Sequence, residues 1–199
     1  MTGSVQESLR RLVADLARLR VRYALVGGFA VSTRAAPRFT RDVDVCVSVE
    51  HDADAERLVH DLTGIGYQVA AVVEHEQSQR LAAARLISPV PGSVLVDLLF
   101  ASSGVEPEIV EAAELLEILP QLRLPVARSA HLVVLKLLAR DDGARPQDAM
   151  DLRALRPVLT DDDAAEALEL ARLVTTRGYD RGRDLMALTR EYTDDRAAR

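Results

Sequence analysis

The chain has 199 residues, of which 48% are hydrophobic and 4% aromatic, and it carries a formal net charge of −6. This length and apolar content suit a soluble globular protein with one larger domain, or a catalytic domain with a helical appendage. The acidic balance argues against a broadly basic nucleic-acid surface, while a local arginine patch stays compatible with it.

Cysteine usage and hydropathy indicate the compartment. The single cysteine, Cys46, excludes an internal disulfide framework and fits a reducing cytoplasm. The N-terminus has no basic-then-apolar signal pattern, and no apolar run reaches the roughly eighteen residues of a membrane span. We therefore expect a cytoplasmic protein with no membrane partner. Lys136 is the single lysine among 25 basic residues, and such arginine-rich usage is typical of GC-rich bacterial coding.

The first half of the chain alternates helical and strand patterns. Apolar residues recur at helical spacing near the N-terminus, and shorter apolar runs bounded by turn residues follow. Pro37 ends one short helix, because the residue before a proline avoids helical geometry. In chain order we expect a helix over 4–20, a strand at Tyr23–Val26, a short helix at Gly28–Ala36, a strand at Val43–Val49, a helix at Asp52–Ile65, and strands at Tyr67–Val73, Arg80–Ile87 and Val94–Phe100.

The second half becomes helical. Residues 106–117 are expected to be weakly helical, and Leu122–Val126 a short strand or an extended linker. Further helices are expected at Ser129–Arg140, Pro146–Leu155, Asp161–Thr176 and Asp180–Tyr192. The predicted fold class is α/β (α+β): a mixed sheet flanked by helices, with a C-terminal helical bundle. We expect a catalytic domain over 1–127 and a helical region over 128–199 that completes a cleft.

Two carboxylates share one face of the strand that begins near residue 43. Residues two apart in a strand point the same way, so Asp42 and Asp44 project together while Val43 and Val45 face the core. Such a pair can simply keep an edge strand soluble. Because like charges repel, however, a cation between them is the favoured reading, and Mg²⁺ is commonly held by one or two carboxylates together with substrate phosphates.

Gly27 and Gly28 stand where a strand gives way to a helix. They can be merely a tight turn. Glycines at this position also let phosphate oxygens approach backbone N–H groups at the positive end of a helix. Asp97 lies alone in the apolar run 94–100, and a buried carboxylate needs a partner. Local hydrogen bonds could provide one, but a metal ion is the partner we favour.

These residues together resemble a known signature. Gly-Gly, about a dozen residues and then Asp-x-Asp between apolar residues is similar to the polymerase-beta type nucleotidyltransferase superfamily. The run Pro-Arg-Phe-Thr-Arg-Asp-Val-Asp at 37–44 resembles minimal bacterial nucleotidyltransferases of the AbiEii toxin kind. The resemblance implies a nucleotidyltransferase fold and a third carboxylate, which Asp97 would supply. Asp42, Asp44 and Asp97 would then hold two Mg²⁺ ions, with Mn²⁺ as the other candidate metal.

The resemblance also suggests residues that grip the nucleotide. The triphosphate would bind to the backbone amides of Gly27 and Gly28 and to the side chains of Arg38 and Arg41. The superfamily often has serine at the second glycine, and here Ser32, Thr33 or Thr40 must supply that hydroxyl. Thr40 is nearest to the family pattern. Arg80 and Arg85 differ by an odd number of residues, so both cannot face one site without a bulge.

Lys136 lies in the apolar run 131–138. It can be a lysine whose stem covers apolar surface. In a chain that otherwise uses arginine, a compact ammonium on a nucleotide phosphate is the favoured interpretation. Asp148 and Asp151 share one face of the next helix, where acids near the N-terminus favour the helix dipole. By resemblance to the AbiEii-like pattern, Asp148 is expected to orient Lys136 or act near the base.

The activity implied is the transfer of a nucleoside monophosphate from an NTP to an acceptor hydroxyl, with release of pyrophosphate. Asp97 would be the nearest group to a general base. An AbiEii-like toxin would modify RNA, such as a tRNA end, or a protein, and an antitoxin would restrain it. Small-molecule enzymes of the aminoglycoside or lincosamide type share the same core. The acidic net charge favours a cationic drug or a protein, whereas the resemblance of the helices to the toxins favours RNA. An inactive nucleotide-binding or interaction module is the alternative from another class.

Overall fold

A computed structural model describes residues 2–75, 79–141 and 146–197. The helices are α1 (Thr2–Arg18), α2 (Gly27–Arg34), α3 (Asp52–Thr63), α4 (Glu106–Glu111), α5 (Ser129–Ala139), α6 (Pro146–Leu155), α7 (Asp161–Thr176) and α8 (Leu185–Ala197), with a 3-10 turn at Arg156–Val158. The strands are β1 (Tyr23–Leu25), β2 (Val43–Val47), β3 (Gln68–Glu74), β4 (Leu81–Ile87), β5 (Leu95–Leu99), β6 (Glu114–Leu119) and β7 (Leu122–Val126).

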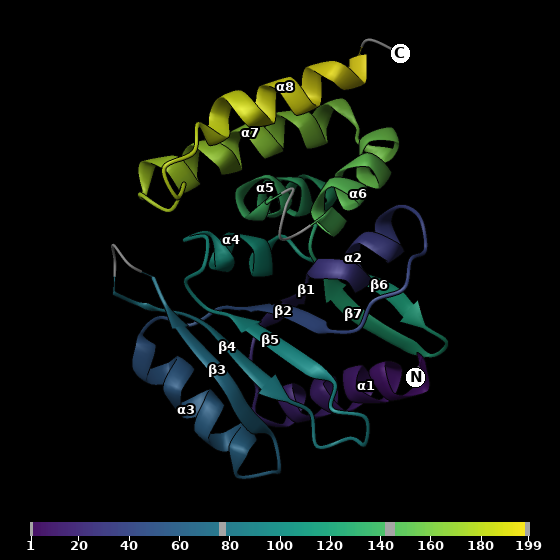
Figure 1. Cartoon of the computed structure of the whole chain (residues 1–199), viewed down its shortest axis with the longest axis vertical. Coiled ribbons are helices and arrows are strands. Elements are labelled where there is room, and N and C mark those ends of the chain that lie inside the picture. The colour runs from purple at the N-terminus through teal and green to yellow at the C-terminus, as the bar shows by residue number, and fades with distance from the viewer. Residues whose placement is uncertain (1, 76–78, 142–145, 198–199) are drawn as a thin grey trace.

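The strands described form one mixed sheet in the order β3-β4-β5-β2-β1-β7-β6. Strand β2 runs parallel to β5, and β1 runs parallel to β7, whereas the other neighbours are antiparallel. Figure 1 shows α1 and α3 on one side of the sheet and α2 and α4 on the other. The helices α5 to α8 stack beyond α2 and α4 as a further layer. The predicted fold class is therefore confirmed.

Most element positions agree with the sequence pattern, and two differ. Residues 106–117 were expected to be one weak helix, but the helix ends at Glu111 and β6 follows. Strand β6 pairs antiparallel with β7 across a tight turn in which Gln121 has φ 63°. The last helix begins at Leu185 rather than at Asp180, because Asp184 accepts a hydrogen bond from the Ala187 N–H and so caps the helix there.

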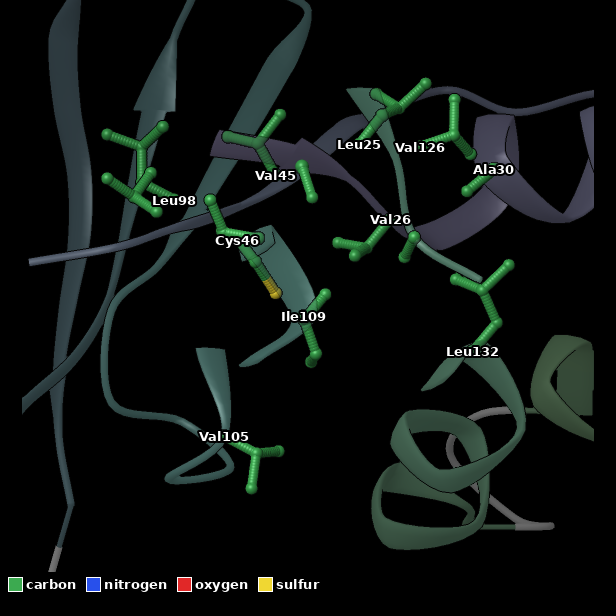
Figure 2. Close-up of a cluster of buried hydrophobic side chains, with 14 of the residues drawn as sticks. Leu25, Val26, Ala30, Val45, Cys46, Leu98, Val105, Ile109, Val126 and Leu132 are labelled. Carbon is green, nitrogen blue, oxygen red and sulfur yellow. The ribbon is translucent and has the colours of Figure 1, made fainter. Parts of the chain in front are cut away.

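The core packs both sides of the sheet. Buried side chains from the sheet and from the C-terminal helices belong to one hydrophobic cluster, so the division at 127/128 stays a prediction. Figure 2 shows part of it, where residues of β1, β2 and β5 meet α2, α4 and α5. Cys46 is fully buried in it, and burial raises the pKa of its thiol well above the ordinary value. Within the described ranges, no helix has both the length and the apolar composition to cross a bilayer.

Helix α4 is short, and we expect its place under the sheet to depend on Ile109. This side chain is fully buried (Figure 2), so Ile109→Ala should lower the free energy of unfolding by about 2–5 kcal/mol through lost burial and a cavity. Urea unfolding followed by circular dichroism measures the change. Leu115→Ala on β6 is the control, because Leu115 is 62% exposed and should change stability by no more than about 0.5 kcal/mol. Equal effects of both changes would contradict this account of the core.

Candidate active site

Strand β1 and helix α2 meet at a turn that is fastened to β2. The Val26 N–H donates to the Asp44 carbonyl oxygen at 2.9 Å. Gly27 follows with φ +62°, a left-handed conformation that favours glycine. A Cβ on Gly27 would lie only 2.0 Å from Asp44 Oδ2. Glycine is therefore required here both by the backbone conformation and by the Asp44 carboxylate beside it.

The second glycine lies against the loop that follows α2. A Cβ on Gly28 would lie 2.6 Å from Thr40 Oγ1 and 2.9 Å from Arg38 Nη2. The Thr40 hydroxyl thus occupies the space into which a serine side chain at 28 would extend. The Ser32 hydroxyl instead bonds the Arg38 backbone, and the Thr33 hydroxyl donates to the carbonyl of its own helix four residues back. Of the three hydroxyls considered from the sequence, Thr40 is the one that lines the cleft described below.

Three carboxylates come together across two neighbouring strands. Asp44 on β2 stands directly opposite Asp97 on the parallel strand β5. Asp42, Asp44 and Asp97 all line one cleft. Burial raises the pKa of the Asp42 carboxyl, and the negative charge of Asp97 raises it further, whereas Arg85 and Arg41 lower it. The sequence pattern predicted this grouping, and the parallel pairing of β2 with β5 produces it.

Arg85 is the neighbour of Asp97 on the other side. The register of β4 against β5 pairs the two residues. The guanidinium donates from Nε to Asp97 Oδ1 and from Nη2 to Oδ2, each at 2.7 Å. Arg80 instead donates to Asp52 at 2.9 Å, so of these two arginines Arg85 is the one that lines the cleft. The sequence left open which of the two arginines faces the site, because the answer depends on the strand register.

The carboxylates fit a metal ion only in part. Over the described residues, no group of three or more His, Cys, Asp or Glu side chains lies close enough to bind one ion together. Asp42 and Asp44 offer two carboxylates on one cleft wall, the number that Mg²⁺ often takes from a protein when substrate phosphates complete its shell. Asp97 does not fit as a third ligand in this arrangement, because both of its oxygens bond to Arg85.

A buried ionic cluster supports the opposite wall. Lys136 Nζ lies 2.8 Å from Asp148 Oδ1 and 2.8 Å from Asp151 Oδ2, and both aspartates are fully buried. Asp151 also accepts two hydrogen bonds from the Arg38 guanidinium, one of them 2.8 Å long. Lys136 and Arg38 line the cleft, whereas Asp148 and Asp151 lie behind them. Asp148 does contact Lys136, as expected for an orienting residue. Asp151, left open from the sequence, joins the two cations.

The cleft has a volume of about 730 Å³ and lies between the sheet and α5. Besides the predicted residues, its walls include Leu132, Leu135, Ser102 and Ser103. Its charged side chains are Asp42, Asp44 and Asp97 against Arg38, Arg41, Arg85, Lys136 and Arg181. The cleft of this acidic protein therefore carries more positive than negative side chains. Arg181 was also missed from the sequence, because only the fold brings the turn before α8 to this site.

We expect a side chain at position 27 to be excluded by the Asp44 carboxylate as well as by the left-handed backbone conformation. Gly27→Ala should distort the Asp44 carboxylate, lower the free energy of unfolding and weaken nucleotide binding. Gly182→Ala is the matched control: Gly182 has φ +70°, but a Cβ there meets nothing within 4 Å. It should cost only the left-handed strain of about 1–2 kcal/mol and leave binding unchanged. Urea unfolding and titration with an NTP would measure both, and equal behaviour of the two variants would contradict the prediction.

Comparison with known proteins identifies the family. A model described as nucleotidyl transferase AbiEii toxin, type IV toxin–antitoxin system, matches residues 9–199. No curated protein matches the chain. The solution structure of the antibiotic-resistance factor ANT(2'')-Ia superposes with a TM-score of 0.52 at 16% identity, covering 100% of this chain and 95% of that one. A nucleotidyltransferase-like antigen from Paracoccidioides brasiliensis superposes with a TM-score of 0.52 at 19% identity, covering 95% and 93%.

At these identities the two structures establish the fold, and the family match extends over nearly the whole chain. Nucleotidyltransferases move a nucleoside monophosphate from a nucleotide to an acceptor. The chain is therefore a transferase enzyme and belongs to the AbiEii family of nucleotidyltransferase toxins.

Proposed function

We propose that the protein transfers a nucleoside monophosphate from an NTP to a hydroxyl of an RNA end, with Asp42 and Asp44 holding Mg²⁺. The observation that carries this proposal is a cleft lined by both carboxylates, both glycines and five cationic side chains, in which the Asp44 carboxylate lies against Gly27. When bound there, Mg²⁺ would neutralise phosphate charge and polarise the reacting phosphorus centre.

The triphosphate would lie along the wall formed by α2 and α5. No side chain caps the N-terminus of α2, so its first-turn N–H groups are suited to an anion at the positive end of the helix dipole. The Thr40 hydroxyl and the Arg38 guanidinium lie beside Gly28. Lys136, held by Asp148 and Asp151, would add a fixed positive charge. These groups would orient the α-phosphorus and stabilise the leaving pyrophosphate.

The acceptor would approach from the side of β4 and β5. Its hydroxyl oxygen would form a bond to the α-phosphorus while the bond from that phosphorus to the pyrophosphate oxygen breaks. Asp97 is the carboxylate on that side and would take the hydroxyl proton once Arg85 releases one of its oxygens. Chemically, the step transfers the monophosphate and leaves free pyrophosphate.

The charge of the cleft supports an anionic acceptor. Arg85 lies on β4, separated from β1 and the diglycine turn by β5 and β2. Arg181 donates to the Ser102 carbonyl and hydroxyl at 3.1 and 3.2 Å, just after β5. These two arginines thus lie away from the proposed triphosphate wall, where RNA phosphates could reach them. The net charge of the whole chain favoured a cationic drug or a protein, but Arg85 and Arg181 offer contacts for the phosphates of an RNA acceptor. The family's toxin–antitoxin description further leads us to propose an antitoxin partner.

The first test is loss of the carboxylates. Asp42→Asn and Asp44→Asn should each reduce transfer of label from an α-³²P NTP to tRNA by at least about 100-fold, because each removes a metal-binding charge. Asp54→Asn is the control, since Asp54 pairs with Arg57 on the surface of α3 and should leave transfer unchanged. Addition of EDTA should also abolish labelling. Full activity of the Asp44 variant would refute the proposal, and label in an aminoglycoside instead of RNA would replace the acceptor class.

A second test separates the acceptor wall from the nucleotide wall. Arg181→Gln should raise KM for RNA while leaving KM for the NTP unchanged, and it should reduce the salt slope of RNA binding by about 0.7. Arg177→Gln is the matched control from the same turn, because Arg177 donates to the Gly104 carbonyl and pairs with Glu108 outside the cleft. An equal effect of both variants on RNA binding would contradict a phosphate contact by Arg181.

A further inference from the structure

Arg85 pairs with Asp97, so one of the three cleft carboxylates is bonded to a cationic side chain of the protein itself. In register, Arg85 on β4 faces Asp97 on β5, which in turn faces Asp44 on β2. The guanidinium takes both oxygens of Asp97 through two 2.7 Å hydrogen bonds. Such a bidentate ion pair is among the stronger ionic contacts and has a fixed geometry. The Asp97 carboxylate thus pairs with Arg85 and does not share a cation with Asp42 and Asp44.

Arg85 also influences the other two carboxylates electrostatically. Its positive charge lowers the pKa of Asp42, and in return Asp97, Asp42 and Asp44 all raise the pKa of Arg85. A single arginine therefore balances part of the charge that three aspartates place in one cleft. This is the task that a divalent cation would otherwise perform among the same groups.

The two partners differ in how freely they can move. The Asp97 side chain is 15% exposed and belongs to a central strand, whereas the Arg85 side chain is 48% exposed on a long flexible stem. Arginine stays charged at any physiological pH, so a guanidinium that leaves Asp97 is attracted to any other anion nearby. A phosphate group entering the cleft offers such an anion.

From this geometry we infer that Arg85 is a positioning residue that competes with a divalent metal ion for Asp97. While the guanidinium holds both oxygens, Asp97 does not contribute to metal binding. When a substrate phosphate takes Arg85, Asp97 becomes available to the reaction. The inference rests on the proposed function, because it assumes a divalent ion at Asp42 and Asp44.

The test is a titration of the full chain with Mn²⁺ in the absence of nucleotide. The electron paramagnetic resonance signal of the free ion measures how much Mn²⁺ is bound. Arg85→Gln should bind Mn²⁺ roughly fivefold more tightly than the unchanged protein, the gain expected when a partly exposed ion pair no longer competes. Arg85→Lys keeps the charge but cannot form the bidentate hydrogen bond, so it should show a smaller gain in Mn²⁺ affinity. Loss of packing alone would not tighten metal binding.

Two controls decide between competition and simple charge removal. Arg80→Gln removes an arginine that pairs with Asp52 outside the cleft, and it should leave Mn²⁺ affinity unchanged. In an Asp97→Asn background the gain from Arg85→Gln should be much smaller, because the ligand released by Arg85 is gone and only the loss of its positive charge near Asp42 and Asp44 remains. An unchanged affinity in Arg85→Gln at an unchanged melting temperature would overturn the inference, as would an equal gain with and without Asp97.

Failure of this inference can be distinguished from failure of the proposed function. The inference is judged by differences in metal affinity among the arginine variants, with no turnover required. The proposed function is judged by transfer of label to RNA and by its dependence on Asp42 and Asp44. A wild-type enzyme that labels RNA, with equal Mn²⁺ affinity in Arg85→Gln, would retain the function and reject the role of Arg85.

Discussion

The parallel pairing of β2 with β5 is the constraint on which the site depends, because it puts the carboxylates of Asp44 and Asp97 side by side. Like charges this close repel and are costly to bury without cations. The surrounding structure supplies them from separate elements: Arg85 from β4, Arg41 from the loop before β2, and further cations from α5 and the turn before α8. The charges of the three carboxylates are thus balanced by cationic side chains of the protein itself.

The C-terminal helices belong to this balance as much as the sheet does. Lys136 on α5 and Arg38 in the loop after α2 both bond to Asp151 on α6, and Asp148 provides a second partner for the lysine. Removing one partner of a buried ion pair typically costs about 3–5 kcal/mol, because the remaining charge stays buried. The cluster therefore fixes the helical layer relative to the loop that lines the cleft. Stability and the shape of the cleft depend on the same contacts.

Much of this organisation is readable from the sequence, since it rests on local patterns. The Asp42 and Asp44 spacing, the two glycines between strand and helix, and the isolated Asp97 predicted one site, and the structure brings all of them to one cleft. The conformation of β6 was missed because its leucines and glutamates suit a weak helix as well as an edge strand, and pairing with β7 decides between them. Arg181 was missed because its partner Ser102 lies far away in the chain, and the roles of Arg85 and Asp151 stayed open because their partners lie 12 and 15 residues away.

The close approach of Thr40 to Gly28 has a consequence for how related sequences can vary. With Thr40 Oγ1 where a side chain at 28 would lie, positions 28 and 40 share one hydroxyl-sized space. A serine at 28 and a threonine at 40 cannot both keep this backbone, so the two positions should change together rather than singly. The loop that carries Thr40 is anchored by Arg38 to Asp151, so the shape of the cleft at this point depends on the C-terminal helices.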